Sequence, residues 1–312
     1  MMRRCLVLGV NGQDGSYLAE ALLRRGYQVT GIGRDAASRY VSSASAFRYV
    51  SCDLRDGDAL ARIVDATDPE FAFHFAAVHG ASGFRYEELW RDMMAVNVLS
   101  LHVLLEHARR AARASMRVIY AGSAKIFPTP LMGVIDETTT ARATCLYGIG
   151  KMASRDLIAY FRAHHGVKAT NIVLFQHESP RRATQYLLPT IARAIRKAQN
   201  DPDHHTSIET LDFRIDWSDA PELMDIVIDI AERSDAEELV LASGKTWHAR
   251  LAVEDLFAHH GLDMDRHLVE SLPRSDPGPD FKVCLAKLER EIGRRPVKSL
   301  YQIFDSMLAA VN

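Results

Sequence analysis

The feature that most constrains the fold is a glycine-rich turn after the first apolar run of the chain. The segment Gly9-Val10-Asn11-Gly12-Gln13-Asp14-Gly15 follows the run Cys5–Leu8 and opens Ser16–Arg25, whose apolar residues recur at helical spacing. Glycine allows a tight turn, a close approach of backbone to a pyrophosphate, and close packing of helix on strand, and the helix N-terminus offers amide donors. This strand, turn and helix predict a dinucleotide-binding fold. The cofactor-binding residues predicted here are Gly9, Asn11, Gly12, Gln13, Asp14 and Gly15.

The first half of the chain alternates β-rich apolar runs with amphipathic helical stretches. This pattern is typical of a parallel sheet with helices on both faces, so we predict an α/β fold with a Rossmann-type doubly wound parallel sheet. The expected strands are Cys5–Leu8, Gln28–Gly31, Phe47–Cys52, Phe71–Phe75, Arg117–Ala121 and Ala169–Phe175. The expected helices are Ser16–Arg25, Asp58–Ala66, Met93–Ala114 and Gly148–His165.

After Phe175 the predicted elements become shorter and are separated by prolines and by a polar loop at Asn200–Thr206. We therefore predict a dinucleotide-binding domain over residues 1–175. A smaller C-terminal lobe over residues 176–312 is expected to be mainly substrate-binding. One further strand, near residues 238–242, is expected to return to the main sheet.

Composition and charge exclude several classes of protein. The 38 Lys plus Arg residues nearly balance the 40 Asp plus Glu residues, so no nucleic-acid partner is expected. No apolar run approaches the about 18 residues of a membrane span, and the apolar start ends too soon for a signal peptide, so we expect a cytoplasmic protein with no membrane partner. Four scattered cysteines suggest neither a disulfide framework nor a zinc site. The pairs His164-His165, His204-His205 and His259-His260 are interpreted as surface residues, and no metal is predicted.

The end of the second strand indicates which dinucleotide is bound. An acidic residue there hydrogen-bonds the ribose of NAD, whereas an arginine accommodates the extra phosphate of NADP. Arg34 and Asp35 stand side by side, but Arg34 comes first and Arg39 follows, so we predict NADP, with NAD as the alternative. The other cofactor-binding residues predicted at strand ends are Asp53 and Leu54, near the adenine, and Ala76 and Ala77, near the nicotinamide.

A tyrosine and a lysine at helical spacing are the predicted catalytic pair. Tyr147 and Lys151 lie at i and i+4, hence on one face of a helix. A tyrosine has an ordinary pKa near 10, so a nearby cation is needed to favour phenolate, and Lys151 can be that cation while holding the cofactor ribose. Ser123, at the end of the fifth strand, is placed to hold the substrate oxygen. Asn97, in the preceding helix, would complete a proton relay.

With these residues the chain resembles the extended short-chain dehydrogenase/reductases of the NAD-dependent epimerase/dehydratase group, and within them it is similar to GDP-mannose 4,6-dehydratases. The GxxGxxG spacing, the segment Gly12–Glu20, the segment His177–Arg182 and the pair Asp216-Trp217 carry the resemblance. It implies a tightly held NADP, a GDP-hexose substrate, and a homodimer or homotetramer in which two helices pair across a two-fold axis. It also implies oxidation at sugar C4 by Tyr147, loss of water across C5 and C6, and return of the hydride to C6. The resemblance places His177 at the cofactor and Gln176 and Glu178 at the substrate.

The departures from the family pattern concern the second step of the reaction. The family has Thr-Ser-Glu where this chain has Ser123-Ala124-Lys125, so the carboxylate that handles the C5 proton is replaced by a lysine. An ammonium needs a large pKa shift before it can accept a proton, which favours epimerisation or reduction over dehydration. In the similar GDP-sugar epimerases a cysteine occupies the position of Lys125. Alternatively, Lys125 anchors a phosphate or a substrate carboxylate, or forms a salt bridge with Glu137.

The remaining candidates concern the sugar nucleotide. Guanidinium groups suit phosphate oxygens, and the family's arginine before Asp-Trp is Ile215 here, so Arg214 is a possible replacement. The substrate-binding residues predicted beyond the family motif are His79, Arg181, Arg182, Arg193, Arg214 and Arg274. Our leading hypothesis is hydride transfer at C4 of a nucleotide sugar. The alternatives are a GDP-mannose 4,6-dehydratase proper and a cofactor-binding sensor or scaffold without turnover.

Overall fold

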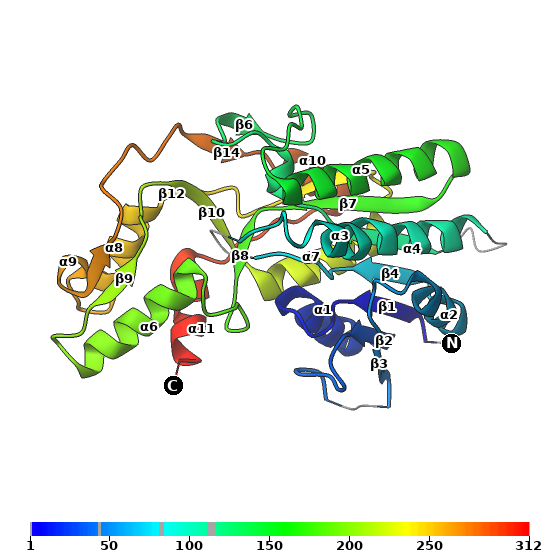
Figure 1. Ribbon diagram of the computed structural model, residues 1–312, viewed down its shortest axis with the longest axis horizontal. Helices are drawn as coiled ribbons and strands as arrows, with labels where there is room; N and C mark the ends of the chain where they lie inside the picture. The colour runs from blue at the N-terminus through cyan, green and yellow to red at the C-terminus, as the bar shows by residue number, and fades with distance from the viewer. Residues whose placement is uncertain (1, 43–44, 81–83, 111–115, 312) are drawn as a thin grey trace.

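A seven-stranded parallel sheet organises the protein. The computed structural model describes residues 2–42, 45–80, 84–110 and 116–311 (Figure 1). The strand order is β11-β7-β5-β4-β1-β2-β3, and every neighbouring pair is parallel. The predicted Rossmann-type doubly wound sheet is therefore confirmed. Its strands are β1 (Arg4–Leu8), β2 (Gln28–Gly33), β3 (Phe47–Ser51), β4 (Phe71–His74), β5 (Arg117–Ala121), β7 (Lys168–Leu174) and β11 (Glu238–Leu241).

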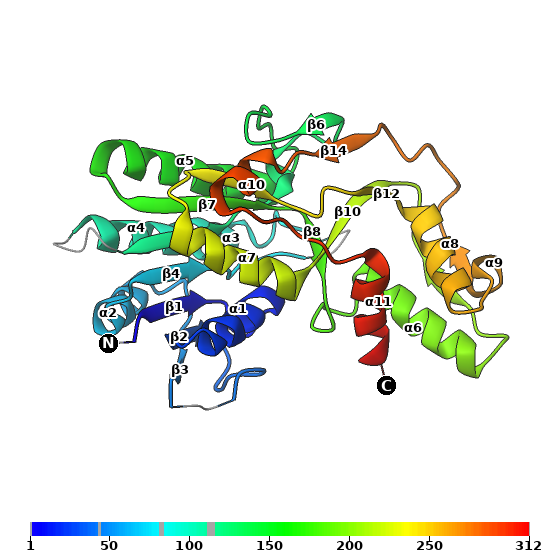
Figure 2. The ribbon, with the colours of Figure 1, turned by 180° about the vertical axis from the view of Figure 1, so that it is seen from behind.

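Helices cover both faces of this sheet because alternate strand residues point to opposite faces. In β1, Val7 packs in the core on the face covered by α1 (Gln13–Arg24), α7 (Ala220–Arg233) and α10 (Ala286–Ile292). Figure 2 shows these three helices from behind. Leu6 and Leu8 pack in the opposite core beneath α2 (Gly57–Thr67), α4 (Ser100–Arg109) and α5 (Leu146–His165). Because the strands are parallel, their carboxyl ends lie along one edge of the sheet, which is where ligands bind in such folds.

The helix expected over Met93–Ala114 is not a single regular helix. It begins with α3 (Trp90–Met94), passes through a π-helical turn labelled η1 (Ala95–Leu99), and continues as α4 to Arg109. Its expected last residues, 111–114, lie outside the described residues. The π turn shifts the backbone pairing next to Asn97, a feature that apolar spacing does not reveal.

A second, smaller region has its own sheets and its own core. β10 (Arg214–Asp219) runs parallel to β8 (Gln176–Glu178) and antiparallel to β12 (Thr246–His248), while β9 (Thr206–Ile208) pairs with β13 (Leu268–Glu270). Leu188, Trp217, Phe257 and Phe304 belong to the core of this region. Its helices are α6 (Leu187–Asn200), α8 (Ala249–His259), α9 (Met264–His267) and α11 (Leu300–Ala309). Two short elements, η2 (Ala124–Ile126) and the strand pair β6 (Gly133–Ile135) with β14 (Phe281–Val283), lie beside the large sheet.

The chain passes between the two regions several times. β7 belongs to the large sheet and β8 to the small one, and only Phe175 separates them. The segments 220–241 and 286–292 then return to the large core, so residues 176–312 are divided between both cores. A domain boundary at residue 175 stays a prediction about function. Among the described residues, no helix combines the length and the apolar character that a membrane span requires.

Candidate active site

The glycine turn has the shape that the sequence predicts. Gly9 has a φ of +88°, and a methyl group added there would lie 2.6 Å from the backbone nitrogen of Ala76. A methyl group on Gly15 would lie 2.2 Å from the carbonyl oxygen of Gly9. Gly12 precedes α1 and has no side chain to cap it, so the first amides of the helix remain open to a ligand. This cradle, which any Cβ would fill, fits the pyrophosphate of a dinucleotide.

Arg34 and Asp35 have different surroundings at the end of β2. The Asp35 carboxylate accepts hydrogen bonds from Arg39 Nε at 2.7 Å and from Asn11 Nδ2 at 2.7 Å, and these partners lower its pKa. Asn11 also accepts the backbone N–H of Arg39 at 3.0 Å, which ties the loop after β2 to the glycine turn. The exposed Arg34 guanidinium makes no hydrogen bond or ion pair with any residue that the structure describes.

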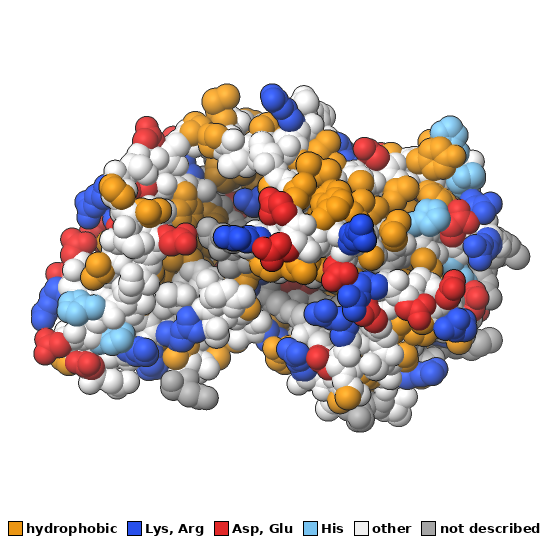
Figure 3. Space-filling view, viewed as in Figure 1, with side chains coloured by type: hydrophobic (Ala, Val, Ile, Leu, Met, Phe, Trp, Pro, Cys, Tyr) orange, Lys and Arg blue, Asp and Glu red, His pale blue; other side chains and the backbone are white. Residues whose placement is uncertain are grey.

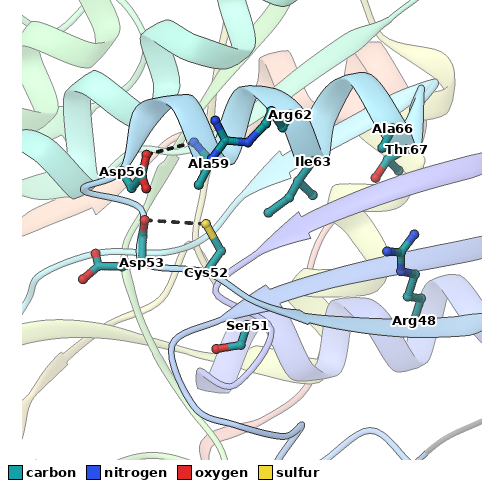
Figure 4. Close-up of a pocket in the computed structure, with 10 residues that line it drawn as sticks. All are labelled: Arg48, Ser51, Cys52, Asp53, Asp56, Ala59, Arg62, Ile63, Ala66 and Thr67. Atoms are coloured by element: carbon teal, nitrogen blue, oxygen red, sulfur yellow. Dashed lines mark hydrogen bonds between the residues drawn. The ribbon is translucent and has the colours of Figure 1, made fainter.

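Asp53 is one of the residues that line a pocket between β3 and α2. Figure 4 shows this pocket, which has a volume of about 420 Å³ and is lined by Cys52, Ile63 and eight further residues of β3, α2 and the loop between them. Asp53 itself is held by Arg55, whose guanidinium donates at 2.9 Å and 2.6 Å and lowers the pKa of the carboxyl. Leu54 is buried. None of the predicted catalytic side chains lines this pocket.

Tyr147, Lys151 and Ser123 come together at the ends of α5 and β5. Lys151 Nζ lies 5.4 Å from the centre of the Tyr147 ring, and the Ser123 side chain is near enough to the phenol to lower its pKa. Burial raises the pKa of Tyr147 well above its ordinary value, with only a partial offset from Ser123. The lowered phenol pKa expected from Lys151 is therefore not found, because burial is the largest influence on the Tyr147 hydroxyl. Lys151 Nζ donates to the Ala121 carbonyl at 2.6 Å and to the Tyr120 hydroxyl at 3.1 Å. Burial lowers the pKa of Lys151 to about 7.

Asn97 lies beneath this group but contacts it through its backbone. Its side chain pairs with the backbone of Val78, accepting the N–H at 2.8 Å and donating to the carbonyl at 3.3 Å. Its carbonyl oxygen accepts from the Tyr120 hydroxyl at 2.8 Å and from Ser154 at 3.1 Å. Asn97 is therefore linked to Lys151 through its carbonyl oxygen and Tyr120, a residue that no sequence pattern marks, and the relay through Asn97 stays a prediction.

The rings of His79 and Tyr86 pack against the phenol, and Tyr186 contacts His79. The His79 ring lies 4.7 Å from the ring of Tyr147, and its Nδ1 lies 2.9 Å from the Tyr186 hydroxyl. Desolvation, together with the positive charges of Arg182 and Lys151, lowers the pKa of His79 to about 4. Tyr86 stacks on Tyr147 with ring centres 5.7 Å apart. No motif marks Tyr86 or Tyr186 in the sequence. Ala76 and Ala77, between β4 and His79, line the same edge of the sheet.

The segment after β7 forms a buried polar layer between α1 and the small sheet. His177 Nε2 lies 3.0 Å from both carboxylate oxygens of Asp14, and its Nδ1 lies 2.7 Å from the Phe175 carbonyl. Burial opposes the charge on Asp14, but His177 outweighs it and lowers the pKa of Asp14 to about 2. The pKa of His177 is raised by Asp14 against the effect of burial. Gln13 completes the layer by accepting the Ser179 hydroxyl at 2.8 Å.

Glu178 and Arg182 form the wall of the site on the side of the small sheet. Glu178 is 1% exposed, and Gln176 donates to its Oε1 at 2.7 Å. Its Oε2 has no hydrogen-bond partner and lies 3.7 Å from Arg182 Nε. Burial raises the pKa of Glu178 despite the nearby positive charge. The Arg182 guanidinium lies 3.6 Å from the centre of the Tyr186 ring.

The other predicted arginines do not converge on one point. Arg181 donates to Glu20 at 2.6 Å and lies between the rings of Tyr17 and Tyr40, so it packs against α1 and its charge is already paired. Neighbouring side chains point in different directions, and here Arg182, not Arg181, faces the site. Arg193 donates to the Thr184 carbonyl at 2.5 Å, Arg214 pairs with Asp280 at 2.8 Å, and Arg274 is exposed.

Lys125 stands apart from the carboxylates of the described residues. Glu137 accepts the backbone N–H of Val240 at 2.8 Å, so its carboxylate faces β11. The proposed Lys125–Glu137 salt bridge is therefore wrong, as the carboxylate is used to hold a strand of the main sheet. Lys125 is exposed beside Ser123, whose hydroxyl accepts the Lys125 backbone N–H at 3.2 Å.

In the pair His259-His260, His259 is exposed as predicted, whereas His260 is partly buried. His259, His260 and Asp305 each offer a ligand atom, and these atoms lie within 4.8 Å of one another. His260 Nε2 is 3.6 Å from the Asp305 carboxylate, and the His260 ring packs 5.9 Å from that of Phe304. These contacts join α8 to α11, two helices of the smaller region (Figure 2).

The matching family model and three proteins to which this chain is similar are all described as sugar-nucleotide 4,6-dehydratases. The family model described as GDP-mannose 4,6 dehydratase matches residues 6–282. The GDP-mannose 4,6-dehydratase of Vibrio cholerae is 29% identical over 310 residues, covering 91% of this chain and 81% of that protein. The one of Yersinia enterocolitica is 30% identical over 281 residues, covering 85% and 74%. The dTDP-glucose 4,6-dehydratase of Bacillus anthracis, solved in complex with NAD, superposes with a TM-score of 0.83 at 13% identity over 99% of this chain and 96% of that one.

Proposed function

The chain belongs to the GDP-mannose 4,6-dehydratase family, and from this premise we propose that it transfers a hydride to and from C4 of a GDP-linked hexose. The observation that carries the proposal is the convergence of Tyr147, Ser123 and Lys151 at the edge of the sheet where the glycine turn opens. When bound there, a nicotinamide dinucleotide supplies the hydride acceptor and donor. Gly9, Gly12 and Gly15 would cradle its pyrophosphate, and His177 and Ala76 would border its nicotinamide.

Each residue of the Tyr147 group has a distinct part in this proposal. Tyr147 removes and returns the proton of the C4 hydroxyl, and Ser123 holds the same oxygen. The phenol needs help to ionise because burial raises its pKa, and the only cation whose ammonium lies over its ring among the described contacts is Lys151. His79, with its lowered pKa, is a neutral hydrogen-bonding group for the sugar at neutral pH.

Lys125 supports epimerisation or reduction as the second step. It occupies the position of the family carboxylate, it is exposed beside Ser123, and the described carboxylates leave it unpaired. An ammonium at this position can hold a phosphate or a developing oxyanion but does not take a proton from C5 while it is charged.

A 4,6-dehydratase proper is the second candidate, and Glu178 favours it. This buried carboxyl has a raised pKa and one oxygen without a hydrogen-bond partner. A carboxyl with a raised pKa suits proton transfer near neutral pH. Glu178 would then supply the proton transfer that the family assigns to the carboxylate missing at position 125.

NADP is the form of cofactor that we propose. Support comes from Arg34, which is exposed and unpaired among the described residues, while Asp35 is occupied by Arg39 and Asn11. A free guanidinium suits the extra phosphate, whereas an occupied carboxylate is less available to ribose hydroxyls. The diphosphate of the sugar nucleotide would be held by Arg182 and Arg214, with Arg193 and Arg274 as further candidates.

A homodimer or homotetramer is proposed from the surface of η1 and α5. Leu99, Ile149 and Tyr160 are exposed on these helices, and Figure 3 shows apolar side chains gathered over α3 and α5 on this face. Burying such residues against a second copy across a two-fold axis would remove them from water. A cytoplasmic location stays a prediction.

The test is incubation of the purified protein and its cofactor with GDP-, CDP- and UDP-hexoses, followed by mass spectrometry and NMR of the products. Unchanged mass with altered stereochemistry supports epimerisation, and loss of one water supports the dehydratase. Reduction of a keto-sugar consumes NADPH and adds two hydrogens. No product with any sugar supports the sensor or scaffold. Tyr147→Phe must abolish the activity found, while Tyr86→Phe, which removes the hydroxyl of the neighbouring ring, should keep most of it.

A further inference from the structure

The ammonium of Lys151 is held by two oxygens of β5. Lys151 is 2% exposed, and its Nζ donates to the Ala121 carbonyl at 2.6 Å and to the Tyr120 hydroxyl at 3.1 Å. None of the ion pairs among the described residues includes Lys151, so these two oxygens are the groups that stabilise its charge most directly. The side-chain contribution comes from Tyr120 alone.

Tyr120 has only one proton to donate, and that proton goes to Asn97. The Tyr120 hydroxyl is fully buried and donates to the Asn97 carbonyl at 2.8 Å. This carbonyl lies in the π turn η1, where a helix departs from regular pairing, and it also accepts from Ser154 at 3.1 Å. The hydrogen bonds therefore run in one direction, from Lys151 through Tyr120 to Asn97. An ammonium can only donate and a carbonyl can only accept, so donor and acceptor cannot exchange roles.

We propose that Tyr120 is a positioning residue that holds the Lys151 ammonium at Tyr147 and ends the hydrogen-bond chain at the Asn97 carbonyl. A carbonyl oxygen has no proton to pass on, so the Tyr147–Lys151 pair exchanges no proton with solvent along this route. This inference rests on the proposed function, in which Tyr147 acts as the acid and base of the reaction. It favours reactions without net proton uptake, such as epimerisation or dehydration, over reduction of a carbonyl, which takes up one proton with each hydride.

The titration of Lys151 is the property that Tyr120 would control. Burial brings the pKa of Lys151 close to neutrality, so a single hydrogen bond decides which form prevails. The only described charge that raises the pKa of Lys151 is Asp14, on α1. The titratable groups that face Lys151 from the surrounding elements are Tyr120 on β5, Tyr147 on α5, Asp14 on α1, His74 on β4 and His79 after it.

Tyr120→Phe removes the hydroxyl and keeps the ring, and Ser154→Ala is its matched control. Ser154 donates to the same Asn97 carbonyl but is not one of the hydrogen-bond partners of Lys151. The pKa of Lys151 is measured by NMR titration of lysines labelled with 13C at Cε in the full chain, with and without NADP, and is assigned with Lys151→Arg. We expect Tyr120→Phe to lower this pKa by about one unit, since a hydrogen bond to a charged group is worth about a tenfold change in an equilibrium. Ser154→Ala should leave it unchanged.

The pH profile of turnover should follow the titration. In Tyr120→Phe, the pH at which kcat falls on the alkaline side should decrease by the same one unit. A purely structural defect would instead lower kcat at every pH and leave this midpoint unchanged. An unmoved Lys151 titration in Tyr120→Phe, or an equal shift in Ser154→Ala, overturns the proposal. Turnover that persists in Tyr147→Phe would instead overturn the proposed function. The Lys151 titration would still test the role of Tyr120 independently.

The wild-type protein gives a second measurement that needs no variant to fold. The Tyr120 hydroxyl proton should exchange with solvent far more slowly than those of exposed tyrosines, because it is buried and donated to a carbonyl. The deuterium isotope shift on 13Cζ-labelled tyrosine reports this exchange, with Tyr120 assigned through Tyr120→Phe or through its ring contact with Lys151. Fast exchange of the Tyr120 hydroxyl proton would show that solvent reaches this hydrogen-bond chain and would overturn the proposal.

Discussion

The pair Asp14–His177 should make a measurable and pH-dependent contribution to stability. It joins the helix that opens at the cofactor cradle to the first residues of the small sheet, with His177 Nε2 3.0 Å from the Asp14 carboxylate. Asp14→Asn keeps the shape of the side chain and removes its charge. His177 then loses the partner that raises its pKa, while its hydrogen bond to the Phe175 carbonyl remains.

The magnitude follows from the pKa of Asp14. Each pH unit between the unfolded and folded pKa values corresponds to about 1.4 kcal/mol. A carboxyl lowered from 3.8 to about 2 therefore contributes about 2.5 kcal/mol at pH values above both. This stability is present above the unfolded pKa and is lost as the pH falls towards 2. The raised pKa of His177 adds stability that is present below about 6.5 and is lost as the pH rises through its folded value. The pair should therefore stabilise the protein most between about pH 4 and 6.5.

Urea unfolding followed by tryptophan fluorescence tests this window. At pH 5.5 we expect Asp14→Asn to lower the free energy of unfolding by about 2.5 kcal/mol, and by clearly less at a pH above the folded pKa of His177, where the ring is neutral. Glu106→Gln is the control, because Glu106 pairs with the partly exposed Arg109 and such a surface pair contributes about 1 kcal/mol or less. A loss below about 0.5 kcal/mol at pH 5.5, or an equal loss at both pH values, would refute the reasoning.

Three further predictions concern the cofactor and the assembly. Gly15→Ala places a methyl group 2.2 Å from the Gly9 carbonyl, so it should abolish NADPH binding in fluorescence titrations while circular dichroism shows a folded protein; unimpaired binding would contradict the cradle. Arg34→Ala should weaken NADP binding by about 30-fold, as expected for one charge-assisted phosphate contact, and should leave NAD binding unchanged in calorimetry. An equal loss for both dinucleotides would argue against the phosphate assignment. Ile149→Glu should convert the oligomer to monomers in light scattering, because it puts a charge into an apolar contact; a persisting oligomer would place the interface elsewhere.

Local patterns predicted much of the fold and part of the site. The glycine turn, the strand ends and the i, i+4 spacing of Tyr147 and Lys151 depend on neighbouring residues, and the structure brings these groups to one edge of the sheet. The pKa of Tyr147 could not be predicted, because it depends on burial by segments distant in sequence. The choice between Arg181 and Arg182 depends on side-chain direction after a proline.

Contacts between distant segments account for the other differences. Glu137 is only twelve residues from Lys125 in the sequence, yet it serves β11 instead. The proposed role of Tyr120 depends on its hydrogen bond to the Asn97 carbonyl, which lies in a π turn, and no residue pattern marks such a turn. Tyr86 and Tyr186 reach the site from loops, where spacing carries little information.

The repeated passage of the chain between its two regions has a consequence for how the protein can come apart. β11, α7 and α10 complete the large sheet and its helical cover, although they are encoded after the first strands of the small region. A fragment that stops at residue 175 would lack an edge strand and would expose the apolar faces that α7 and α10 cover. Neither region can therefore be cut away or unfolded alone without damage to the other. Heat should melt the two in one cooperative transition, and a protease that nicks either region should inactivate the whole chain.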